Sequence, residues 1–333
     1  MKLIISELKD RARYTSREAA YIISELIDNY GWSQIETEEL YYSSRSLKSL
    51  LLNRFTELPE IILCWEGYYL LSARKSEINS LDCAKYIFCD DLHAGEEHSQ
   101  EEMLEAFSMV NTILSTYGYV FDSFFPELSK TKRVVWIPHS ASPDFLLAFN
   151  KHPVNAILLS GVVDDYYPLR MRMKALCDKG SYPILTHQHP GYRCDFDHET
   201  DTSIGRGYAK RINTYRAAFT DSSKYRYSVA KYFEIPATGA LLLADCAVSE
   251  PLRRIGFIEG VHYLGVSNED LEEKIEYTLD ENNHDELDEV RRNGQELVWG
   301  RHTTSDRARS IDEICTLEDG FRKTGSPFDG ESS

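Results

Sequence analysis

Residues 231–245 read Lys231-Tyr-Phe-Glu-Ile-Pro-Ala-Thr-Gly-Ala-Leu-Leu-Leu-Ala-Asp245. This pattern predicts a short helix that carries Glu234 and is stopped by Pro236 and Gly239, because proline cannot continue a helix and glycine supplies the turn. An apolar strand, Ala240–Ala244, follows at once. Glu234 is therefore expected at a helix–strand corner, where open parallel sheets present side chains to ligands.

Strand-like runs alternate with helical patterns along the whole chain, which predicts an α/β fold with two parallel sheets. The expected strands are Lys2–Ser6, Glu60–Cys64, Lys85–Cys89, Arg133–Ile137, Ala156–Ser160, Tyr182–Thr186, Arg216–Phe219, Ala240–Ala244 and Val261–Leu264. The expected helices are Ser16–Asn29, Glu101–Tyr117, Leu169–Cys177, Gly207–Thr214, Val229–Phe233, Glu269–Leu279, Glu286–Leu297 and Ser305–Ile314. In the second of these, Met103, Phe107, Val110 and Leu114 recur at helical spacing.

A polar stretch with a proline, Asn150–Val154, precedes a fresh apolar strand and marks the expected domain boundary. We expect two Rossmann-like domains, 1–150 and 151–304, followed by a helix over 305–322 and a flexible tail over 323–333. Thr303 and Asp306 form the expected capping box at the start of that last helix, with Asp in place of the usual Glu or Gln.

The net charge of the chain limits the kinds of ligand that it is expected to bind. With 37 Lys and Arg against 54 Asp and Glu, the net charge is −17. Such a chain is a poor match for the phosphate contacts that drive binding of free nucleic acid, whereas a small phosphorylated ligand is not excluded. The seven scattered cysteines contain no C-x-x-C pair, which favours reduced thiols in the cytoplasm. No apolar run is long enough for a signal peptide or a membrane span.

Several signatures of the last third resemble, in family order, the sugar-nucleotide domain of group 1 glycosyltransferases of the GT-B architecture. The spore-maturation-type, family-four-like branch is the nearest. Residues 231–244 are similar to the family's E-x-P-A-x-G-x-L-L-L motif, and further signatures occupy 256–263, 268–277, 292–294 and 302–307. The resemblance implies two Rossmann-like domains facing across a cleft, with a final helix crossing back. It implies nucleotide in the second domain and acceptor in the first.

The resemblance also implies an activity. A glycosyltransferase of this kind moves a sugar from a nucleoside-diphosphate donor to a hydroxyl acceptor such as a glycan. It needs no metal and no cofactor beyond the donor, and the branch favours retention of the anomeric configuration. Many retaining members carry a second Glu eight positions before the first, where this chain has Arg226. Arg226 weakens the expectation of retention, and it is a candidate cation near the diphosphate.

The donor contacts implied by the resemblance fall on three segments. Glu234 would hold the ribose. The loop Ser160-Gly-Val-Val-Asp-Asp-Tyr-Tyr-Pro-Leu-Arg-Met-Arg172, which includes Gly161, would bring Arg170 and Arg172 to the diphosphate, where fixed cations stabilise the leaving group. Lys231 lies three residues before Glu234, shares roughly its helix face and is the preferred partner for phosphate. A solvated helix face is the alternative for the arginines, and a solvated helix-end carboxylate is the alternative for Glu234.

Two motifs after the Tyr182–Thr186 strand have both a functional and a structural explanation. His187 and His189 stand where α/β sheets present ligands, although a Pro-Gly turn accounts for them equally well. Asp195 and Asp197 match the D-x-D pattern that holds a divalent metal in another glycosyltransferase architecture. Such a pair also arises by chance in an acidic chain, so no metal site is expected.

The first half offers candidates for the general base that accepts the acceptor proton. Asp90, Asp91 and His93 follow one expected strand, and His139 follows another. A helix cap for the aspartates and a satisfied histidine are the structural alternatives. The glycine-rich loop common after the first strand of related enzymes is missing here. The dinucleotide fingerprint G-x-G-x-x-G is also absent, which argues against an NAD enzyme.

Three hypotheses therefore remain open from the sequence. The first is a metal-independent glycosyltransferase of GT-B architecture. The second is a non-catalytic sugar-nucleotide or glycan-binding protein of the same fold. The third is a metal-dependent glycosyltransferase that uses Asp195 and Asp197.

Overall fold

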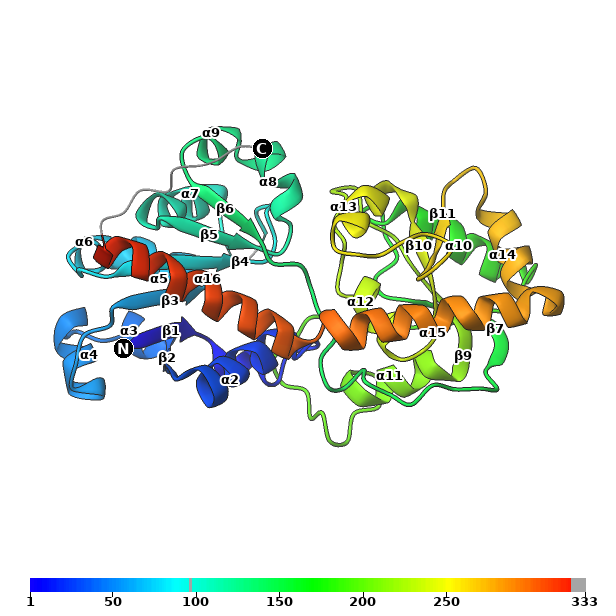
Figure 1. Ribbon diagram of the computed structural model, residues 1–333, viewed down its shortest axis with the longest axis horizontal. Coiled ribbons are helices and arrows are strands. Elements are labelled where there is room, and N and C mark those ends of the chain that lie inside the picture. The colour runs from blue at the N-terminus through cyan, green and yellow to red at the C-terminus, as the bar shows by residue number, and fades with distance from the viewer. Residues whose placement is uncertain (96–97, 325–333) are drawn as a thin grey trace. The chain divides into compact units, whose positions relative to one another are not determined.

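The structure is a computed structural model that describes residues 1–95 and 98–324 (Figure 1). The chain forms two compact units. The first unit contains Met1–Lys9, Ile22–Pro138 and the chain from Arg307 onward, and the second contains Asp10–Tyr21 and His139–Asp306. The two parallel sheets that the alternating pattern predicts are both present, so the predicted α/β fold class is confirmed.

A six-stranded sheet in the order β2-β1-β3-β4-β5-β6 forms the first unit, and all its strands are parallel. Its strands are β1 (Lys2–Ser6), β2 (Trp32–Glu36), β3 (Ile61–Trp65), β4 (Ala84–Cys89), β5 (Thr112–Ser115) and β6 (Arg133–Trp136). The helices that connect them are α3 (Thr37–Tyr41), α4 (Leu47–Phe55), α5 (Tyr68–Ala73), α6 (Lys75–Asn79), α7 (Gln100–Met109), η1 (Gly118–Val120), α8 (Phe121–Phe124) and α9 (Pro126–Ser129). Strand β3 is buried along its whole length, as expected for a strand covered on both faces.

The expected helix Glu101–Tyr117 is wrong in its second half. Helix α7 ends at Met109, and Val110 takes up an extended conformation, with φ −106° and ψ 158°. The following strand β5 is Thr-Ile-Leu-Ser and is buried throughout. Threonine and isoleucine are β-branched and favour a pleated surface. Both Val110 and Leu114 are buried, so the helical spacing detected burial correctly but not the change of element.

The second unit holds a five-stranded parallel sheet in the order β11-β10-β9-β7-β8. Its strands are β7 (Val154–Ser160), β8 (Ile184–His187), β9 (Tyr215–Thr220), β10 (Leu241–Asp245) and β11 (Leu264–Val266). Its helices are α10 (Pro168–Lys179), α11 (Gly205–Thr214), α12 (Lys231–Ala237), η2 (Cys246–Val248), α13 (Ser249–Arg254), α14 (Leu271–Leu279), η3 (Glu281–Asn283) and α15 (His284–Arg301).

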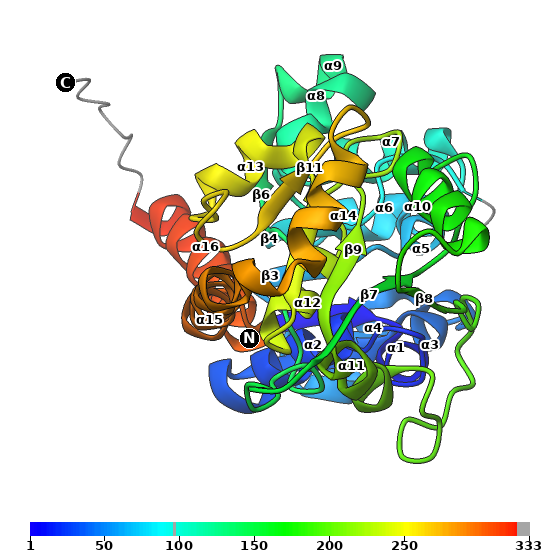
Figure 2. The ribbon, with the colours of Figure 1, turned by 90° about the vertical axis from the view of Figure 1, so that its right-hand side faces the viewer.

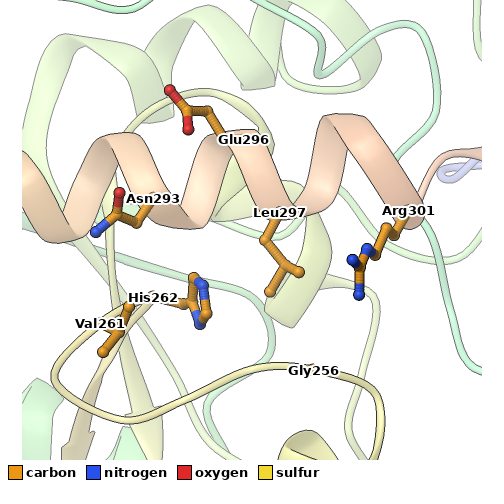
Figure 3. Close-up of a pocket in the computed structure, with 7 residues that line it drawn as sticks. All are labelled: Gly256, Val261, His262, Asn293, Glu296, Leu297 and Arg301. Carbon is orange, nitrogen blue, oxygen red and sulfur yellow. The ribbon is translucent and has the colours of Figure 1, made fainter.

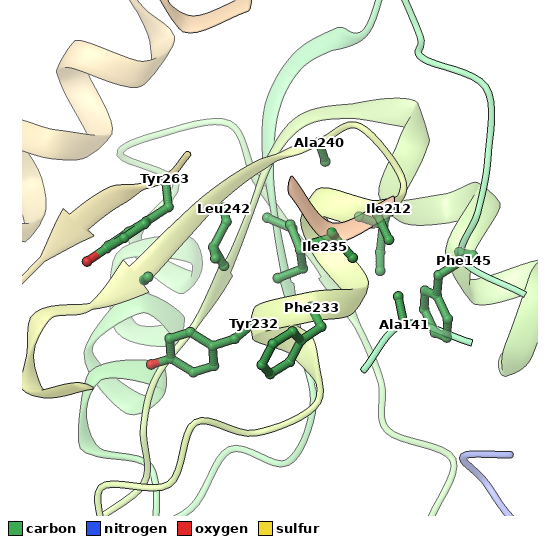
Figure 4. Close-up of a cluster of buried hydrophobic side chains, with 14 of the residues drawn as sticks. Ala141, Phe145, Ile212, Tyr232, Phe233, Ile235, Ala240, Leu242 and Tyr263 are labelled. Atoms are coloured by element: carbon green, nitrogen blue, oxygen red, sulfur yellow. The ribbon is translucent and has the colours of Figure 1, made fainter. Parts of the chain in front are cut away.

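Two hydrophobic clusters cover the two faces of this sheet. Helices α10 and α14 cover one face of the sheet (Figure 2). Their side chains pack against alternate strand residues such as Leu159 and Phe219. Helices α11 and α12 pack on the other face, against Leu158 and Leu242, with Tyr232 and Phe233 among the buried rings (Figure 4). Successive residues of a strand point to opposite faces, so one strand contributes to both clusters.

Helix α12 runs from Lys231 to Ala237 and includes Pro236, which the sequence analysis expected to stop it. The proline lies in the last turn of a short helix. Its missing N–H and the steric effect of its ring therefore disturb few backbone hydrogen bonds. Thr238 is the C-cap of the helix, and Gly239, with φ +81°, makes the turn into β10 as expected. Gly239 adopts a positive φ that other residues rarely take.

Helix α2 (Glu18–Tyr30) and helix α16 (Thr304–Thr324) each contribute residues to both units. The capping box before α16 is confirmed, because Thr303 N and Oγ1 donate to Asp306 Oδ2 and Asp306 N donates to Thr303 Oγ1. The expected tail begins at residue 323, and its residues 325–333 lie outside the described part of the chain. Among the described residues, no helix has both the length and the hydrophobicity to cross a membrane.

A segment of the N-terminal half, Asp10–Tyr21, belongs to the second unit. It begins inside helix α1 (Leu8–Arg11), whose first two residues belong to the first unit. Arg17 donates to both carboxylate oxygens of Asp144, with Nη2–Oδ1 2.7 Å and Nη2–Oδ2 2.9 Å. This charge-assisted contact fixes the segment against the chain that enters the second unit.

Candidate functional site

Helix α12 presents two ionisable side chains near the carboxyl ends of the strands in the second unit. Glu234 is 7% exposed, and Lys231, one turn earlier, is half-buried. Within the described part of the chain, neither charged group makes a hydrogen bond or an ion pair, although the Lys231 ammonium lies 6.0 Å from the centre of the Tyr208 ring. Buried polar groups normally have hydrogen-bond partners. Two neighbouring charged groups that lack hydrogen bonds and ion pairs therefore indicate a binding site for a polar ligand.

The electrostatics of this pair follow from its burial. Burial raises the pKa of Glu234, and the carboxylates of Glu18 and Asp144 add to that effect while Lys231 opposes it. Burial lowers the pKa of Lys231, with the positive charge of Arg170 acting in the same direction. Perturbed pKa values of this origin are typical of functional sites.

A glycine at the end of β7 brings the backbone close to two cations. Gly161 has φ +96°, and a Cβ there would lie 2.7 Å from Arg170 Nη1 and 3.4 Å from Lys231 Cε. Only glycine fits this close approach without strain. Gly161 and Arg170 of one loop and Lys231 of helix α12 therefore meet in one place.

Arg170 is held firmly by the protein. Its Nη1 donates to Val162 O at 3.1 Å, its Nη2 donates to Thr220 Oγ1 at 3.3 Å, and its Nε lies 3.1 Å from Asp221 Oδ1. Its guanidinium also stacks on Tyr167, 3.7 Å from the ring centre. Burial raises the pKa of Asp221 to about 6, although Arg170 opposes the rise. Arg170 thus contributes a positive charge that is fixed by one hydrogen bond from each of Nη1 and Nη2 and by the ion pair with Asp221.

Tyr208 of α11 links the neighbouring strands. Its hydroxyl lies 2.5 Å from Ser160 Oγ at the end of β7, and its ring stacks on His187 at 5.0 Å. Burial raises the pKa of the Tyr208 phenol, with the charge of Glu234 adding to the effect. His187 Nε2 lies 3.0 Å from Ser203 O, so this histidine of the sequence pair helps to hold the loop after β8.

His189, two residues further on, is half-buried beside the cations. Burial lowers its pKa to about 4, and the positive charges of Lys231 and Arg170 contribute to the fall. Its Nδ1 accepts a hydrogen bond from Gly191 N at 3.1 Å. The imidazole is therefore neutral at physiological pH and joins the group formed by Gly161, Arg170 and Lys231.

Segment 10–21 adds a carboxylate–histidine pair to the same unit. Glu18 Oε2 lies 2.7 Å from His139 Nδ1, while Glu18 Oε1 accepts from the N–H and the hydroxyl of Ser140 at 2.5 and 2.7 Å. Burial pushes the pKa of Glu18 upward, but His139 and Ser140 outweigh it, so the pKa lies below its ordinary value. Both Glu18 and His139 influence the pKa of Glu234, which places them near α12.

Sequence reasoning missed Glu18, Asp144, Tyr208 and Asp221. Asp221 directly follows β9, so the strand-end position that identified other candidates would also have identified it. Glu18 and Asp144 gave no such signal. They are brought together only by the folding of a distant N-terminal segment onto the second unit.

Two of the sequence-derived cations do not join the group around Lys231. Arg172 is on the exposed side of α10, with Nη2 3.7 Å from Glu272 Oε1 of α14. Arg226 is exposed in the loop between β9 and α12, with a positive φ of +58°. A non-glycine residue in that conformation is uncommon and identifies a tightly turned loop.

The other base candidates lie in the first unit, after β4. Asp90 is half-buried, Asp91 is exposed, and His93 Nδ1 lies 3.9 Å from Asp91 Oδ1. His139 is thus the only member of the four candidates that the fold assigns to the second unit.

The D-x-D pair has local partners. Asp197 accepts from Glu199 N at 3.0 Å and from Thr200 Oγ1 at 2.8 Å, which hold the pKa of its carboxyl below the ordinary value. Asp195 Oδ1 lies 3.4 Å from Arg193 Nε. Among the residues that the structure describes, no group of three or more His, Cys, Asp or Glu side chains is placed to hold a metal ion.

A surface hollow of about 480 Å³ lies elsewhere in the second unit, between α15 and the loop before β11 (Figure 3). It is lined by Gly256, Val261, His262, Asn293, Glu296, Leu297 and Arg301. None of the residues around Lys231 contributes to it. The convergence of ionisable groups therefore locates the candidate site better than this hollow does.

Both the sequence and the fold are similar to those of known proteins. The model of a family described as Glycosyl transferase-like matches residues 196–313, about a third of the chain. That stretch contains Tyr208, Asp221, Lys231 and Glu234. A comparison of the sequence with curated proteins finds no significant match.

Three solved structures illustrate the likeness of fold. Sucrose-phosphate synthase from Thermosynechococcus elongatus has a TM-score of 0.63 at 12% identity, covering 96% of this chain and all of that one. A glycosyltransferase from Rickettsia africae has a TM-score of 0.59 at 12% identity, covering 95% and 98%. HepE from Anabaena, in complex with UDP and glucose, has a TM-score of 0.56 at 9% identity, covering 95% and 100%.

At these identities the likeness establishes the fold, which is the two-domain GT-B fold. The family match covers Lys231 and Glu234 of the candidate site, whereas Gly161, Arg170 and His189 precede the matched residues. The protein is a glycosyltransferase in class, with a glycosyltransferase-like domain over residues 196–313.

Proposed function

We propose that this protein transfers a sugar from a nucleoside-diphosphate sugar to a hydroxyl acceptor and that its second unit binds the donor. The pair formed by Lys231 and Glu234 is the main support for this proposal. Glu234 is buried and Lys231 is half-buried, and within the described part of the chain neither charged group has a hydrogen bond or an ion pair. A nucleoside diphosphate has the complementary groups, because its phosphates need a cation and its ribose hydroxyls need an acceptor.

The roles follow from position and charge. Lys231 contacts the diphosphate, and Gly161 lets the phosphates approach the backbone at the end of β7. Arg170 adds positive potential, and its contacts with Val162, Thr220 and Asp221 hold the guanidinium in place. Positive charge fixed in advance stabilises the diphosphate as it departs. Glu234 accepts hydrogen bonds from the ribose hydroxyls.

His189 lies beside the phosphate position, and Arg172 and Arg226 remain proposed peripheral cations that attract the donor over a longer range. The reaction needs no bound metal in this proposal, because the cations of the protein meet the charge of the leaving group. No cofactor besides the donor takes part. The scatter of the seven cysteines supports the cytoplasm as the compartment.

The first unit holds the acceptor in this proposal, and Asp90, Asp91 and His93 are its candidate polar contacts. The acceptor is a glycan or another molecule with a free hydroxyl. His139 is the preferred proton acceptor, because Glu18 fixes its Nδ1 at 2.7 Å and so orients the ring. A carboxylate that orients a histidine also stabilises the protonated imidazole.

One observation favours a second stereochemical outcome. The resemblance to spore-maturation-type enzymes implies retention, whereas a dedicated base such as the Glu18–His139 pair is what single displacement with inversion requires. The anomeric configuration of the first product molecules, read by NMR, separates the two.

A thermal-shift panel tests the proposed function. UDP, ADP, GDP and TDP, each alone and as a sugar conjugate, are added to the full chain. A ligand that binds only the native state raises the melting temperature, and a ligand at 100 times its Kd adds about 2.7 kcal/mol. At least one nucleoside diphosphate is expected to stabilise the wild type but not Lys231→Met. Absence of a shift with every nucleotide would contradict the proposal.

A further inference from the structure

Two loops of the second unit present three aromatic side chains in a row. His189 and Tyr192 follow β8, with ring centres 4.6 Å apart, and Tyr14 of segment 10–21 stacks on Tyr192 at 6.2 Å with an angle of 21° between the ring planes. We call His189, Tyr192 and Tyr14 the aromatic row. Tyr192 is 63% exposed despite both neighbours, which is unusual for so large a side chain held in place.

Hydrogen bonds between the two loops fix the aromatic row. Thr15 Oγ1 donates to Gly191 O at 2.6 Å, and Phe196 N donates to Arg13 O at 3.1 Å. His198 Nε2 lies 2.8 Å from Tyr14 O. The rings are therefore held in position before any ligand arrives, which reduces the entropy lost on binding.

The inner end of the aromatic row lies at the cations. His189 is close enough to Lys231 and Arg170 for both charges to act on its imidazole, and the ring is neutral at physiological pH. From there the row leads outward to the exposed Tyr192. Packed rings connect this end of the row to Lys231, because the Lys231 ammonium lies 6.0 Å from the centre of the Tyr208 ring and that ring stacks on His187, two residues before His189.

We propose that the aromatic row is the stacking subsite for the nucleobase of the sugar-nucleotide donor. This inference rests on the proposed function. In a nucleoside diphosphate one ribose separates the phosphates from a planar base, and every base offers a π face to an aromatic side chain. Tyr14 gives segment 10–21 a second role in the proposed site, in addition to the placement of Glu18.

A second aromatic group in the same unit provides a matched control. Tyr166 is 38% exposed in the loop after β7, and the Lys224 ammonium lies 3.6 Å from the centre of its ring. That cation already covers one face of the ring. Tyr166→Ala therefore removes an exposed tyrosine of the same unit without touching the aromatic row.

Calorimetric titration of the full chain with UDP, ADP and inorganic pyrophosphate tests the inference. Pyrophosphate has the phosphates but no base. Tyr192→Ala is expected to weaken binding of the nucleotides roughly tenfold, the usual range for loss of one stacked base, and to leave pyrophosphate affinity unchanged. Tyr192→Phe is expected to restore nucleotide affinity, and Tyr166→Ala is expected to have no effect.

The possible outcomes distinguish the two proposals. Nucleotide binding that survives Tyr192→Ala unchanged overturns the stacking subsite and leaves the proposed function intact. Equal weakening of nucleotides and pyrophosphate also overturns it, because the row would then act on phosphates alone. A greater loss in Tyr166→Ala than in Tyr192→Ala assigns the base to the other loop. Failure of the wild type to bind any nucleotide overturns the proposed function and this inference with it.

Discussion

Glu18 Oε2 lies 2.7 Å from His139 Nδ1, although 121 residues separate the two in the chain. Both side chains are 13% exposed. Glu18 belongs to the N-terminal segment that folds onto the second unit, and His139 begins the chain that enters this unit from β6. This contact therefore joins two distant parts of the sequence within the second unit.

The Glu18–His139 pair should show energetic coupling. In a double-mutant cycle with Glu18→Gln and His139→Gln, followed by urea unfolding at pH 7, we expect a coupling energy of about 1 kcal/mol or more. The pKa of Glu18 is lowered from its ordinary value of 4.5, so its stabilising effect is present above that pH and is lost as the pH falls through the lowered pKa.

An exposed ion pair serves as the control for this cycle. Lys174 Nζ and Asp178 Oδ1 are 2.5 Å apart on α10, with side chains 40% and 62% exposed. Such surface pairs contribute little. Equal coupling in both cycles, or additive effects of Glu18→Gln and His139→Gln, would contradict the special role of the buried pair.

Gly161→Ala should damage the site more than its backbone conformation alone explains. The new Cβ would lie 2.7 Å from Arg170 Nη1, and it would also carry the cost of a positive φ, about 1–2 kcal/mol. Gly256→Ala is the matched control, because its φ is +97° and its Cβ would be at an ordinary 3.6 Å from Leu297. Thermal unfolding should show a larger loss for Gly161→Ala, and pyrophosphate binding should fall only in that variant. Equal losses would show that Gly161 serves the fold alone.

Glu234→Gln should stabilise the ligand-free protein, and increasingly so as the pH rises. Burial raises the pKa of Glu234, so its contribution to stability is full below its ordinary value of 4.5 and is lost as the pH rises through the raised pKa. Glutamine stays neutral and avoids this loss. The melting temperature of the variant, minus that of the wild type, should increase by a few degrees between pH 4.5 and pH 8. A difference that is constant with pH would contradict the buried, unpaired state of the carboxylate.

Removal of metal ions should leave the activity largely unchanged. The proposed leaving-group charge is met by Lys231 and the fixed charge of Arg170, so donor hydrolysis or transfer in excess EDTA should stay within about twofold of the untreated rate. Asp197→Asn, which alters the D-x-D pair, should behave like the wild type. Complete loss in EDTA that manganese restores, together with loss in Asp197→Asn, would support a metal-dependent enzyme.

The sequence predicted the fold class because strands such as Ala240–Ala244 are apolar runs bounded by turn residues, and local pattern decides such elements. It failed where local and tertiary preferences compete. The Glu101–Tyr117 pattern fits a helix throughout, but Thr112–Ser115 pairs with β4 and β6 and becomes a central strand. The strand Trp32–Glu36 was missed, since only Trp32 and Ile35 of its five residues are fully buried and they do not alternate.

The candidate site was predictable only in its local part. Lys231 and Glu234 are one helical turn apart in a segment that matches a family motif, and the family resemblance also indicated Gly161 and Arg170 in the loop after one strand. Contacts between distant segments carry no such pattern. Glu18 with His139, Arg17 with Asp144, and Tyr14 with Tyr192 all depend on the attachment of segment 10–21 to the second unit.

The most direct test of the account is calorimetric titration of UDP, and of whichever nucleoside diphosphate gives the largest thermal shift, into the wild type and Glu234→Ala. The carboxylate is proposed to accept hydrogen bonds from the ribose, and each charged hydrogen bond lost should cost about 1.5–3 kcal/mol, or roughly tenfold or more in Kd. Pyrophosphate, which has no ribose, should bind both proteins with similar affinity, and Glu273→Ala should match the wild type. A Glu234→Ala variant that is folded by circular dichroism and binds the nucleotide with unchanged affinity would contradict the central claim that this helix–strand corner is the donor site.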